Sequence, residues 1–313
     1  MAAGGEHGTK AVVAALTGNL GIAAAKIVGF LITRSASLLA EAVHSIADSG
    51  NQALLLVGNK QARQEATESH QFGYARARYF WSFVVALVLF ELGAVFAIYE
   101  GIHKIEHPAQ VENLPVALVI LGIAIGLESW SFRTGIGESR PLKGDMSWWR
   151  FIRASRTPEL PVVLLEDFGA LFGLAIAFSA LALSELTGDP VWDGIGTVAI
   201  GVLLGVIATV LVVEMKSLLL GEGASPEDMA KIRTAIQTTP GVTKLIHLRT
   251  QHLGPEELLV AAKLAFDTSM SAEQIAAVIN TVEVNVREQV PYAKPMYVEV
   301  GVFGPDPDPV TGP

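Results

Sequence analysis

Six long apolar segments constrain the fold of this chain more than any other feature of its sequence. Each approaches the roughly 20 helical residues that are needed to cross a hydrocarbon core about 30 Å thick. Backbone polar groups in lipid must be satisfied within each segment, so we expect an α-helical, multi-pass membrane protein. The predicted spans lie near Ala11–Ile32, Ser37–Gly58, Tyr79–Gly101, Leu114–Trp130, Pro158–Leu183 and Val191–Val213.

The composition agrees with this class and excludes several others. Only 17% of the 313 residues are charged and 51% are hydrophobic, whereas soluble domains carry about 25% charged residues. The net charge of −9 disfavours nucleic acid as a partner. The absence of cysteine excludes disulfides, thiolate zinc sites and cysteine nucleophiles. The first ten residues lack the pattern of a secretory signal, so we expect no cleaved signal peptide.

Basic residues in the connections predict the orientation. Four lie between the second and third spans and six between the fourth and fifth, against only Arg34 and Lys104 on the opposite side. By the positive-inside rule, both termini are predicted to be cytoplasmic. The basic residues of the two inner connections are Lys60, Arg63, Arg76 and Arg78, then Arg133, Arg140, Lys143, Arg150, Arg153 and Arg156.

The segment DMSWWRFIRAS, in the second of these connections, combines Trp148, Trp149 and Phe151 with Arg150 and Arg153. Aromatic and basic residues on a short helix are typical of a segment that lies at the membrane interface. We therefore predict an interfacial helix at the inner leaflet, with an ordinary packed loop as the alternative.

The composition changes after about residue 220, where no further apolar run is long enough to span. Residues 225–237 begin with a Ser/Asp-type cap and predict an amphipathic helix, and residues 271–290 predict a second helix. Residues 244–253 and 257–266 flank a Gly-Pro turn and predict a hairpin, and residues 294–303 predict a last strand. The order αββαβ predicts a small α+β domain with both helices on one face of the sheet. The sequence thus divides into a transmembrane domain, residues 1–220, and a cytoplasmic domain, residues 221–313.

The second span contains two ionisable residues four positions apart, His44 and Asp48. This spacing places both on one face of a helix, one turn from each other. An imidazole nitrogen and a carboxylate oxygen so placed can bind one divalent cation. In a soluble helix a solvated face would explain such a pair, but inside a span ionisable groups are costly and indicate function.

The fifth span carries adjacent acids, Glu166 and Asp167, in an otherwise apolar stretch. Two neighbouring carboxylates in hydrocarbon would have to be protonated unless a cation compensates them. A metal ion is the leading interpretation. A helix N-terminal charge or a salt bridge to another span are the structural alternatives.

The depths of these acids in the membrane are similar. Asp48 lies eleven residues past Ser37, or roughly 16 Å along a helix. Asp167 lies nine residues past Pro158 in a span of opposite direction, or roughly 13 Å from the other surface. The acids therefore meet near the midplane, where transporters bind cations. We predict a metal site of His44, Asp48, Glu166 and Asp167.

The sequence resembles the cation diffusion facilitator family. The resemblance is carried by SASLLAEAVHSIADSGNQALLL, HQFGYARARYFWSFVVAL and VVLLEDFGALFGL, and with the tail it covers nearly the whole chain. The Asn-Gln after the second-span pair and the Leu-Leu-Glu-Asp of the fifth span are most similar to the zinc transporter nine subgroup. The resemblance implies six spans and a ferredoxin-like tail.

This resemblance also implies a function. Such a protein would export Zn²⁺, or less often Mn²⁺, Fe²⁺, Co²⁺ or Cd²⁺, in exchange for protons. It would work as a homodimer in the bilayer, in a cell (plasma) membrane, with the metal as substrate and no cofactor. A membrane-embedded metalloenzyme is one alternative, although the sequence has no His-Glu-x-x-His. A metal-sensing scaffold is the other.

Two departures from the family pattern affect the site. Most zinc members have a histidine four residues before the fifth-span aspartate, where this chain has Val163, and Glu166 is the candidate replacement. One histidine with three carboxylates is a harder ligand set than usual, which leaves Mn²⁺ and Fe²⁺ open. In the tail His247 and His252 lie on the hairpin, while the last strand offers no histidine. We therefore expect no strong metal site there.

Other polar residues inside the spans have smaller predicted roles. Asn19, Asn51 and Gln52 are expected to form helix–helix hydrogen bonds rather than to support the metal site. Lys26 is expected either to pair with Glu91 on another helix or to extend its ammonium group to the interface.

Overall fold

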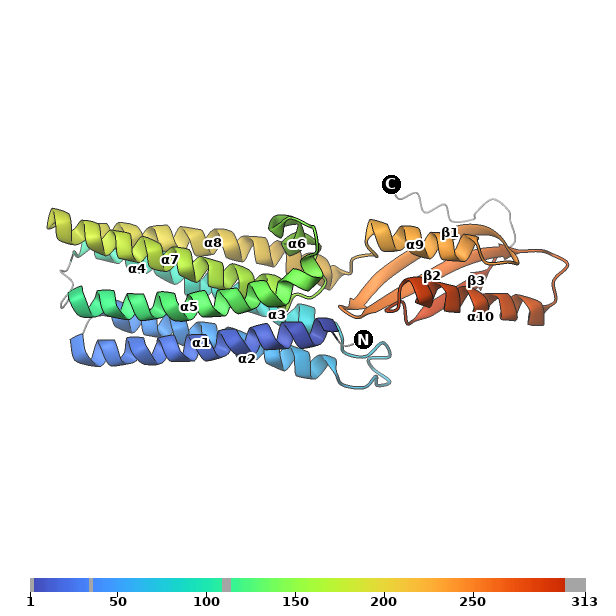
Figure 1. The fold of residues 1–313 in the computed structure, drawn as a ribbon, viewed down its shortest axis with the longest axis horizontal. Coiled ribbons are helices and arrows are strands. Elements are labelled where there is room, and N and C mark those ends of the chain that lie inside the picture. The colour runs from blue at the N-terminus through green and yellow to red at the C-terminus, as the bar shows by residue number, and fades with distance from the viewer. Residues whose placement is uncertain (1–2, 34–35, 109–113, 302–313) are drawn as a thin grey trace. The chain divides into compact units, whose positions relative to one another are not determined.

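A computed structural model describes residues 3–33, 36–108 and 114–301 of the chain (Figure 1). The chain divides into two compact units, Met1–Leu219 and Leu220–Pro313, and each is described by itself.

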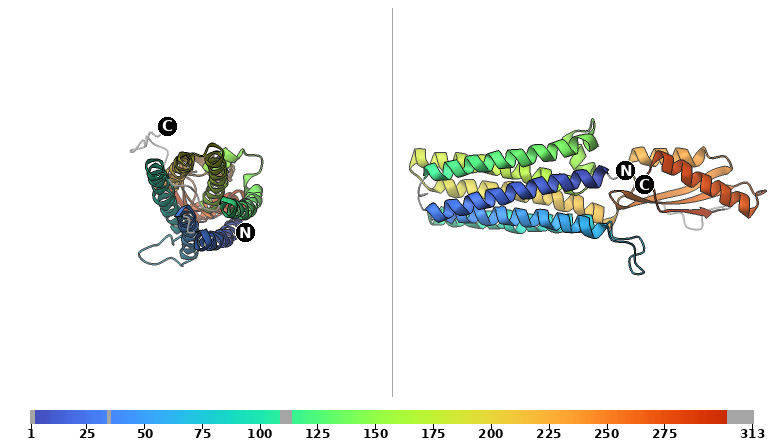
Figure 2. Two further views of the ribbon diagram at one scale, coloured as in Figure 1. Left: turned by 90° about the vertical axis from the view of Figure 1, so that its left-hand side faces the viewer. Right: turned by 60° about the horizontal axis from the view of Figure 1, so that its bottom comes forward.

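Long helices that run alongside one another build the first unit, as the end-on view of Figure 2 shows. Every predicted span lies within one of these helical stretches. Four of them are long and apolar enough to cross a membrane within the described residues, namely Ala77–Glu106, Leu118–Lys143, Glu159–Thr187 and Val191–Leu220. The elements are α1 (Ala3–Thr33), α2 (Ala36–Ala62), α3 (Ala77–Val88), the π-helical turn η1 (Leu89–Val95), α4 (Phe96–Glu106), α5 (Leu114–Lys143), α6 (Trp148–Ala154), α7 (Glu159–Thr187) and α8 (Val191–Leu220).

The third predicted span is one continuous helical stretch with a π-helical turn at its centre. The turn η1 joins α3 to α4 without a break, and it contains Glu91 and Gly93. A π-turn adds a residue to the helical register and so shifts which side chains face the bundle. Glu91 lies exposed in this turn. The buried Lys26, which was expected either to pair with Glu91 or to extend to the interface, donates to Ser45 on α2.

The prediction that the fourth span ends near Trp130 misplaced the end of this helix. Helix α5 continues to Lys143, so Arg133, Arg140 and Lys143 lie on the helix and not in a connecting loop. Hydropathy detects where the apolar stretch ends, whereas the helix continues as long as its backbone is satisfied and one face packs. That face includes buried Ser131 and Ser139 and runs against α7, where Gly135 lies next to Leu164.

The segment after α5 forms the short helix that the sequence predicts. Ser147 caps α6 by accepting a hydrogen bond from the backbone N–H of Arg150. Phe151 on α6 is buried against Leu160 and Leu164 of α7, while Trp149 is exposed. The helix therefore packs through one aromatic residue and exposes another.

Small residues let α4 and α8 approach closely. A Cβ at Gly201 would lie 2.8 Å from the backbone nitrogen of Ile98, and one at Gly101 would lie 2.7 Å from the backbone nitrogen of Val198. Side chains other than hydrogen would force these backbones apart. Close approach at glycine is the usual way in which helices associate in lipid.

A buried ion pair joins the beginning of α3 to that of α7. The Arg78 guanidinium donates from Nε to Oε1 of Glu159 at 2.5 Å and from a terminal nitrogen to Oε2 at 2.8 Å. The two side chains are only 8% and 1% exposed. This two-point contact fixes the two helix ends relative to each other.

The second unit has the element order that the sequence predicts, with α9 (Pro226–Gln237), β1 (Val242–Gly254), β2 (Glu257–Phe266), α10 (Ala272–Gln289) and β3 (Met296–Val300) (Figure 1). The sheet order is β1-β2-β3, with β2 antiparallel to β1 and parallel to β3. Ser225 caps α9, and Ser271 with Gln274 forms a full capping box at α10.

Both helices pack on one face of this sheet, as expected. Alternate residues of β2, including Leu258, Val260 and Leu264, are buried in one core with Ile232 of α9 and Val282 of α10. This alternation is the period of a strand with one covered face.

Candidate metal site

A stripe of buried polar residues runs along α2 and faces the bundle. It comprises Ser45, Asp48, Ser49, Asn51, Gln52 and Asn59. These positions recur at intervals of three and four, which is the period of one helical face. His44 lies in α2 next to this stripe, but its side chain falls outside the described residues.

Helix α7 brings its two acids into the same bundle. Glu166 is 5% exposed and Asp167 is 1% exposed. Val163, at the position where most zinc members have histidine, is fully buried in an apolar cluster with Leu55 of α2 and Leu211 of α8. This position supplies packing and no ligand.

Two consecutive amides of α2 hold the carboxylate of Glu166. Asn51 donates from Nδ2 to Oε1 at 2.9 Å, and Gln52 donates from Nε2 to Oε2 at 2.6 Å. Asn19 of α1 in turn donates to Oε1 of Gln52 at 3.5 Å. These amides do link helices, as predicted, but they do so by binding a candidate ligand. They lie three and four residues after Asp48, and this spacing alone predicts that they share one face of α2 with Asp48.

Asp167 has a different neighbour on a different helix. Ser131 of α5 donates its hydroxyl to Oδ2 of Asp167 at 2.8 Å. Ser131 is not among the candidates predicted from the sequence, because it lies just past Trp130, where the fourth span was expected to end.

The three carboxylates Asp48, Glu166 and Asp167 lie close enough for their charges to interact. The Asp48 charge acts on both Glu166 and Asp167, and Glu166 also feels the charge of Asp167. Within the described residues, no group of three histidines or acids converges tightly enough to form a closed metal cage. The arrangement is therefore a set of buried carboxylates on α2 and α7 rather than a closed cage, with His44 as a further candidate on the same helix as Asp48.

Electrostatics determines what such an arrangement can do. A charge removed from water costs several kcal/mol unless a partner compensates it. Amide and hydroxyl donors satisfy hydrogen-bonding capacity, but they carry no positive charge. An ionised carboxylate has about four lone-pair sites, so Glu166 can accept two amide bonds and still face a cation. The site is chemically suited to bind a divalent cation.

The two histidines of the second unit have different environments. His247 is exposed, whereas His252 is buried and stacks on Tyr292 with ring centroids 6.0 Å apart. On the last strand Tyr297 is exposed and Glu299 pairs with Lys263 at 2.8 Å.

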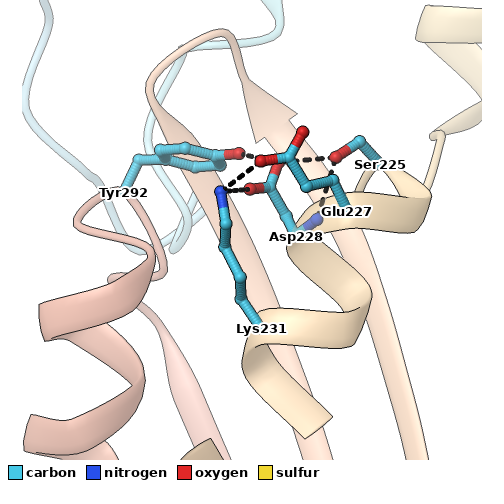
Figure 3. A network of polar contacts seen from close by, with 5 residues as sticks. All are labelled: Ser225, Glu227, Asp228, Lys231 and Tyr292. Atoms are coloured by element: carbon cyan, nitrogen blue, oxygen red, sulfur yellow. Dashed lines mark hydrogen bonds and ion pairs between the residues drawn. The ribbon is translucent and has the colours of Figure 1, made fainter. Parts of the chain in front are cut away.

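A polar network of five residues lies around the beginning of α9 (Figure 3). Asp228 accepts hydrogen bonds from the hydroxyls of Tyr292, at 2.6 Å, and Ser225, at 2.7 Å, and it lies 3.7 Å from Nζ of Lys231. Burial would raise the pKa of Asp228, but these hydrogen bonds and the lysine charge hold that pKa below its ordinary value of 3.8. The network ties α9 to the segment between α10 and β3.

Comparison with known proteins identifies the family. Residues 12–220 match the cation efflux transmembrane domain, and residues 224–300 match the cytoplasmic domain of cation efflux proteins. This chain belongs to the cation efflux family. The resemblance that the sequence motifs carry is thereby confirmed, as is the similarity to the zinc transporter nine subgroup.

The curated relatives are transporters. The proton-coupled zinc antiporter SLC30A9, mitochondrial, of Xenopus laevis is 31% identical over 245 residues, which cover 77% of this chain and 44% of that protein. Metal tolerance protein C4 of Arabidopsis thaliana is 29% identical over 267 residues, 85% of this chain and 58% of that one. CzcD of Cupriavidus metallidurans, a metal cation efflux system protein, is 27% identical and matched over 79% of its length. The chain thus spans less than half of the SLC30A9 proteins.

Among solved structures, the nickel form of a MamM CTD variant matches 26% of this chain at 20% identity with a TM-score of 0.24.

Proposed function

We propose that this protein exports a divalent metal cation, Zn²⁺ first, from the cytoplasm in exchange for protons. The observation that carries the proposal is the group of three buried carboxylates, Asp48, Glu166 and Asp167, of which the two on α7 accept hydrogen bonds from neutral donors of α2 and α5. Relatives that are named proton-coupled zinc antiporters support both the cation and the counter-ion.

The site in this proposal consists of His44, Asp48, Glu166 and Asp167. Metal binding requires the histidine and the carboxylates to lose their protons, so binding and release of metal move protons the other way. Export then follows from rocking of the helices around a site near the midplane. Manganese and iron remain candidate substrates, because carboxylates favour harder ions than imidazole does.

The domain arrangement of this proposal is a six-span transport domain over residues 1–220 and a cytoplasmic, ferredoxin-like domain over residues 221–313, with both termini cytoplasmic. The α9-β1-β2-α10-β3 order and the one-sided sheet support the assignment of the second domain. A homodimer is the proposed assembly, through both domains.

The choice of membrane needs a revision. The sequence analysis expected a plasma membrane, but four vertebrate relatives carry the word mitochondrial in their names, which does not support that expectation. A membrane-embedded metalloenzyme and a metal-sensing scaffold are less well supported, since the family and the named relatives are transporters.

Flux measurement in proteoliposomes tests the proposal. The full chain is reconstituted with a zinc-sensitive dye inside the vesicles, and a proton gradient is imposed. We expect Zn²⁺ to accumulate at a rate that depends on the gradient and falls when a protonophore is added. Mn²⁺ and Fe²⁺ are measured in parallel. Zinc binding without flux would support an enzyme or a sensor instead.

Variants locate the site in the same assay. Asp48→Ala and Asp167→Ala should each abolish flux while leaving the protein folded and inserted, because each removes a charge that compensates the cation. Asp145→Ala is the matched control, since Asp145 is exposed between α5 and α6. Flux at the wild-type rate from either site variant, at equal abundance, would remove that residue from the proposed site.

A further inference from the structure

A small cavity lies beside Asp48 of the candidate metal site, and two of the charged residues that line it, Lys26 and Glu128, have no part in the proposed mechanism. Its volume is about 40 Å³, and its polar lining residues are Lys26 of α1, Ser45 and Asp48 of α2, and Glu128 of α5. The remaining walls are apolar side chains and glycines of α1, α7 and α8. A cavity needs about 10–15 Å³ of such volume to hold one water molecule, so this one has room for about three waters or for the end of a charged side chain.

Lys26 is the unusual member of this lining. Its side chain belongs to a helix in the apolar bundle and is only 4% exposed. The ammonium donates to the hydroxyl of Ser45 at 2.9 Å. Ser45 lies three residues before Asp48, which places it about one helical turn from that carboxylate on the same face.

A lysine in this position bears the same sign of charge as the expected cargo. Ionisable residues inside a membrane domain are expensive and indicate function by default. The bundle contains the carboxylates Asp48, Glu128, Glu166 and Asp167, all at most 6% exposed. A nearby ammonium therefore compensates part of their charge when no metal is bound, and a divalent cation that reaches Asp48 must compete with it.

We propose that Lys26 is a tethered competitor of the transported metal, whose ammonium occupies the cavity beside Asp48 and is displaced when a divalent cation enters. Glu128, across the same cavity on another helix, gives the displaced ammonium a second anionic neighbour. Lys26 thus lowers the affinity for metal and speeds metal release. This inference rests on the proposed function, because it assumes that Asp48 binds the cation.

Metal titration of the full chain in detergent, with Zn²⁺ as the probe, tests the competition. Lys26→Met removes the charge and keeps most of the volume, so it should bind Zn²⁺ at least about tenfold more tightly, since a like charge no longer opposes the cation. Lys26→Arg keeps the charge and should bind close to wild type. Glu128→Gln should change affinity in the opposite direction, toward weaker binding. Lys216→Met is the matched control, because Lys216 is exposed on α8.

Transport kinetics distinguishes competition by Lys26 from a purely structural role of this residue. For Lys26→Met we expect both the KM for Zn²⁺ and the maximal rate to fall, because tighter binding slows release. A packing defect would lower the maximal rate without lowering KM. Thermal unfolding of each variant confirms that the protein remains folded, and Glu128→Gln carries the test if Lys26→Met does not fold.

The outcomes separate this inference from the proposed function. Loss of zinc binding in Asp48→Ala together with tighter binding in Lys26→Met supports both. Loss of binding in Asp48→Ala with unchanged affinity in Lys26→Met overturns the role of Lys26 alone. Wild-type binding in Asp48→Ala overturns the proposed site, and with it the inference. Equal effects of Lys26→Met and Lys216→Met would also refute it, since they would reflect net charge only.

Discussion

Replacing Glu159 with glutamine should destabilise the helical unit strongly, because it breaks the buried ion pair that joins α3 to α7. Both carboxylate oxygens of Glu159 accept from the Arg78 guanidinium, at 2.5 and 2.8 Å. The side chain of Glu159 is 1% exposed and that of Arg78 is 8% exposed. Glutamine keeps the shape but removes the negative charge that faces both donating nitrogens of the buried guanidinium.

The magnitude follows from burial. Two unit charges about 4 Å apart interact by about 4 kcal/mol at an effective dielectric constant of about 20. Removing one partner of a buried pair typically costs about 3–5 kcal/mol, because the other charge stays desolvated. The glutamine amide oxygen retains one hydrogen bond, so we expect a loss of about 2–4 kcal/mol in the free energy of unfolding.

The same unit offers a matched control. Arg153 and Glu214 form an ion pair at 3.1 Å, but the arginine side chain is 61% exposed. Arg153→Gln should cost less, about 1 kcal/mol, because solvent reaches the arginine side of the pair although Glu214 is only 15% exposed. Unfolding is followed in mixed micelles by circular dichroism as the fraction of denaturing detergent increases.

A double-mutant cycle identifies the cause of the loss. Combining Arg78→Leu with Glu159→Leu should recover much of the stability, because apolar replacement of a buried pair is often neutral or stabilising. If Glu159→Gln costs no more than Arg153→Gln, the reasoning from burial is refuted. Additive losses in the double variant would show that the two side chains stabilise the fold separately.

Two further predictions concern packing and pH. Gly201→Ala should lower the stability of the helical unit by about 1–3 kcal/mol, the typical cost of overpacking, because its Cβ would lie 2.8 Å from the Ile98 nitrogen. The measurement is thermal unfolding, with Gly122→Ala as the control because its added Cβ meets nothing within 4 Å. Equal losses of stability in the two variants would contradict the prediction. Tyr292→Phe should destabilise the second unit by about 1 kcal/mol at pH 7 by removing a hydrogen bond to Asp228. Because the pKa of Asp228 is lowered in the folded state, its stabilisation is present above about pH 4 and is lost as the pH falls through that pKa. Urea unfolding at pH 7 and pH 3 should therefore show the effect of Tyr292→Phe shrinking at the lower pH, and a constant difference would contradict the assignment.

The elements of the protein were largely predictable from the sequence because each carries a local signal. Length and apolarity marked the long helices, and a Ser/Asp-type cap marked α9. The end of α5 was not predictable in this way, because hydropathy reports contact with lipid rather than the end of a helix. The π-turn η1 was also missed, since no residue in its sequence requires one.

The partners of the buried polar residues were less predictable, because they depend on how each helix is rotated about its axis. Lys26 was expected to pair with Glu91 or to extend to the interface, and the structure gives it Ser45 as a hydrogen-bond partner. Asn51 and Gln52 were recognised as helix–helix contacts, but their acceptor, Glu166, is more than a hundred residues away in the chain. Such a contact needs the packing of α2 against α7, which sequence spacing on one helix does not define.

Glu166 and Asp167 are adjacent in the sequence, and this spacing makes it difficult for both to bind one ion from the same side of the helix. Adjacent residues on a helix point about 100° apart, which makes it awkward for both to approach one ion from the same direction. In the structure this angle directs Glu166 toward the amides of α2 and Asp167 toward Ser131 of α5. A single acid on this turn of α7 could contact only one of these helices. The two adjacent acids let one turn of α7 present carboxylates to both α2 and α5. The charge of Asp48 on α2 acts on both of these carboxylates. A Glu-Asp dipeptide can therefore serve a shared site better than its sequence spacing suggests, provided that the cation lies between the helices rather than over one face of α7.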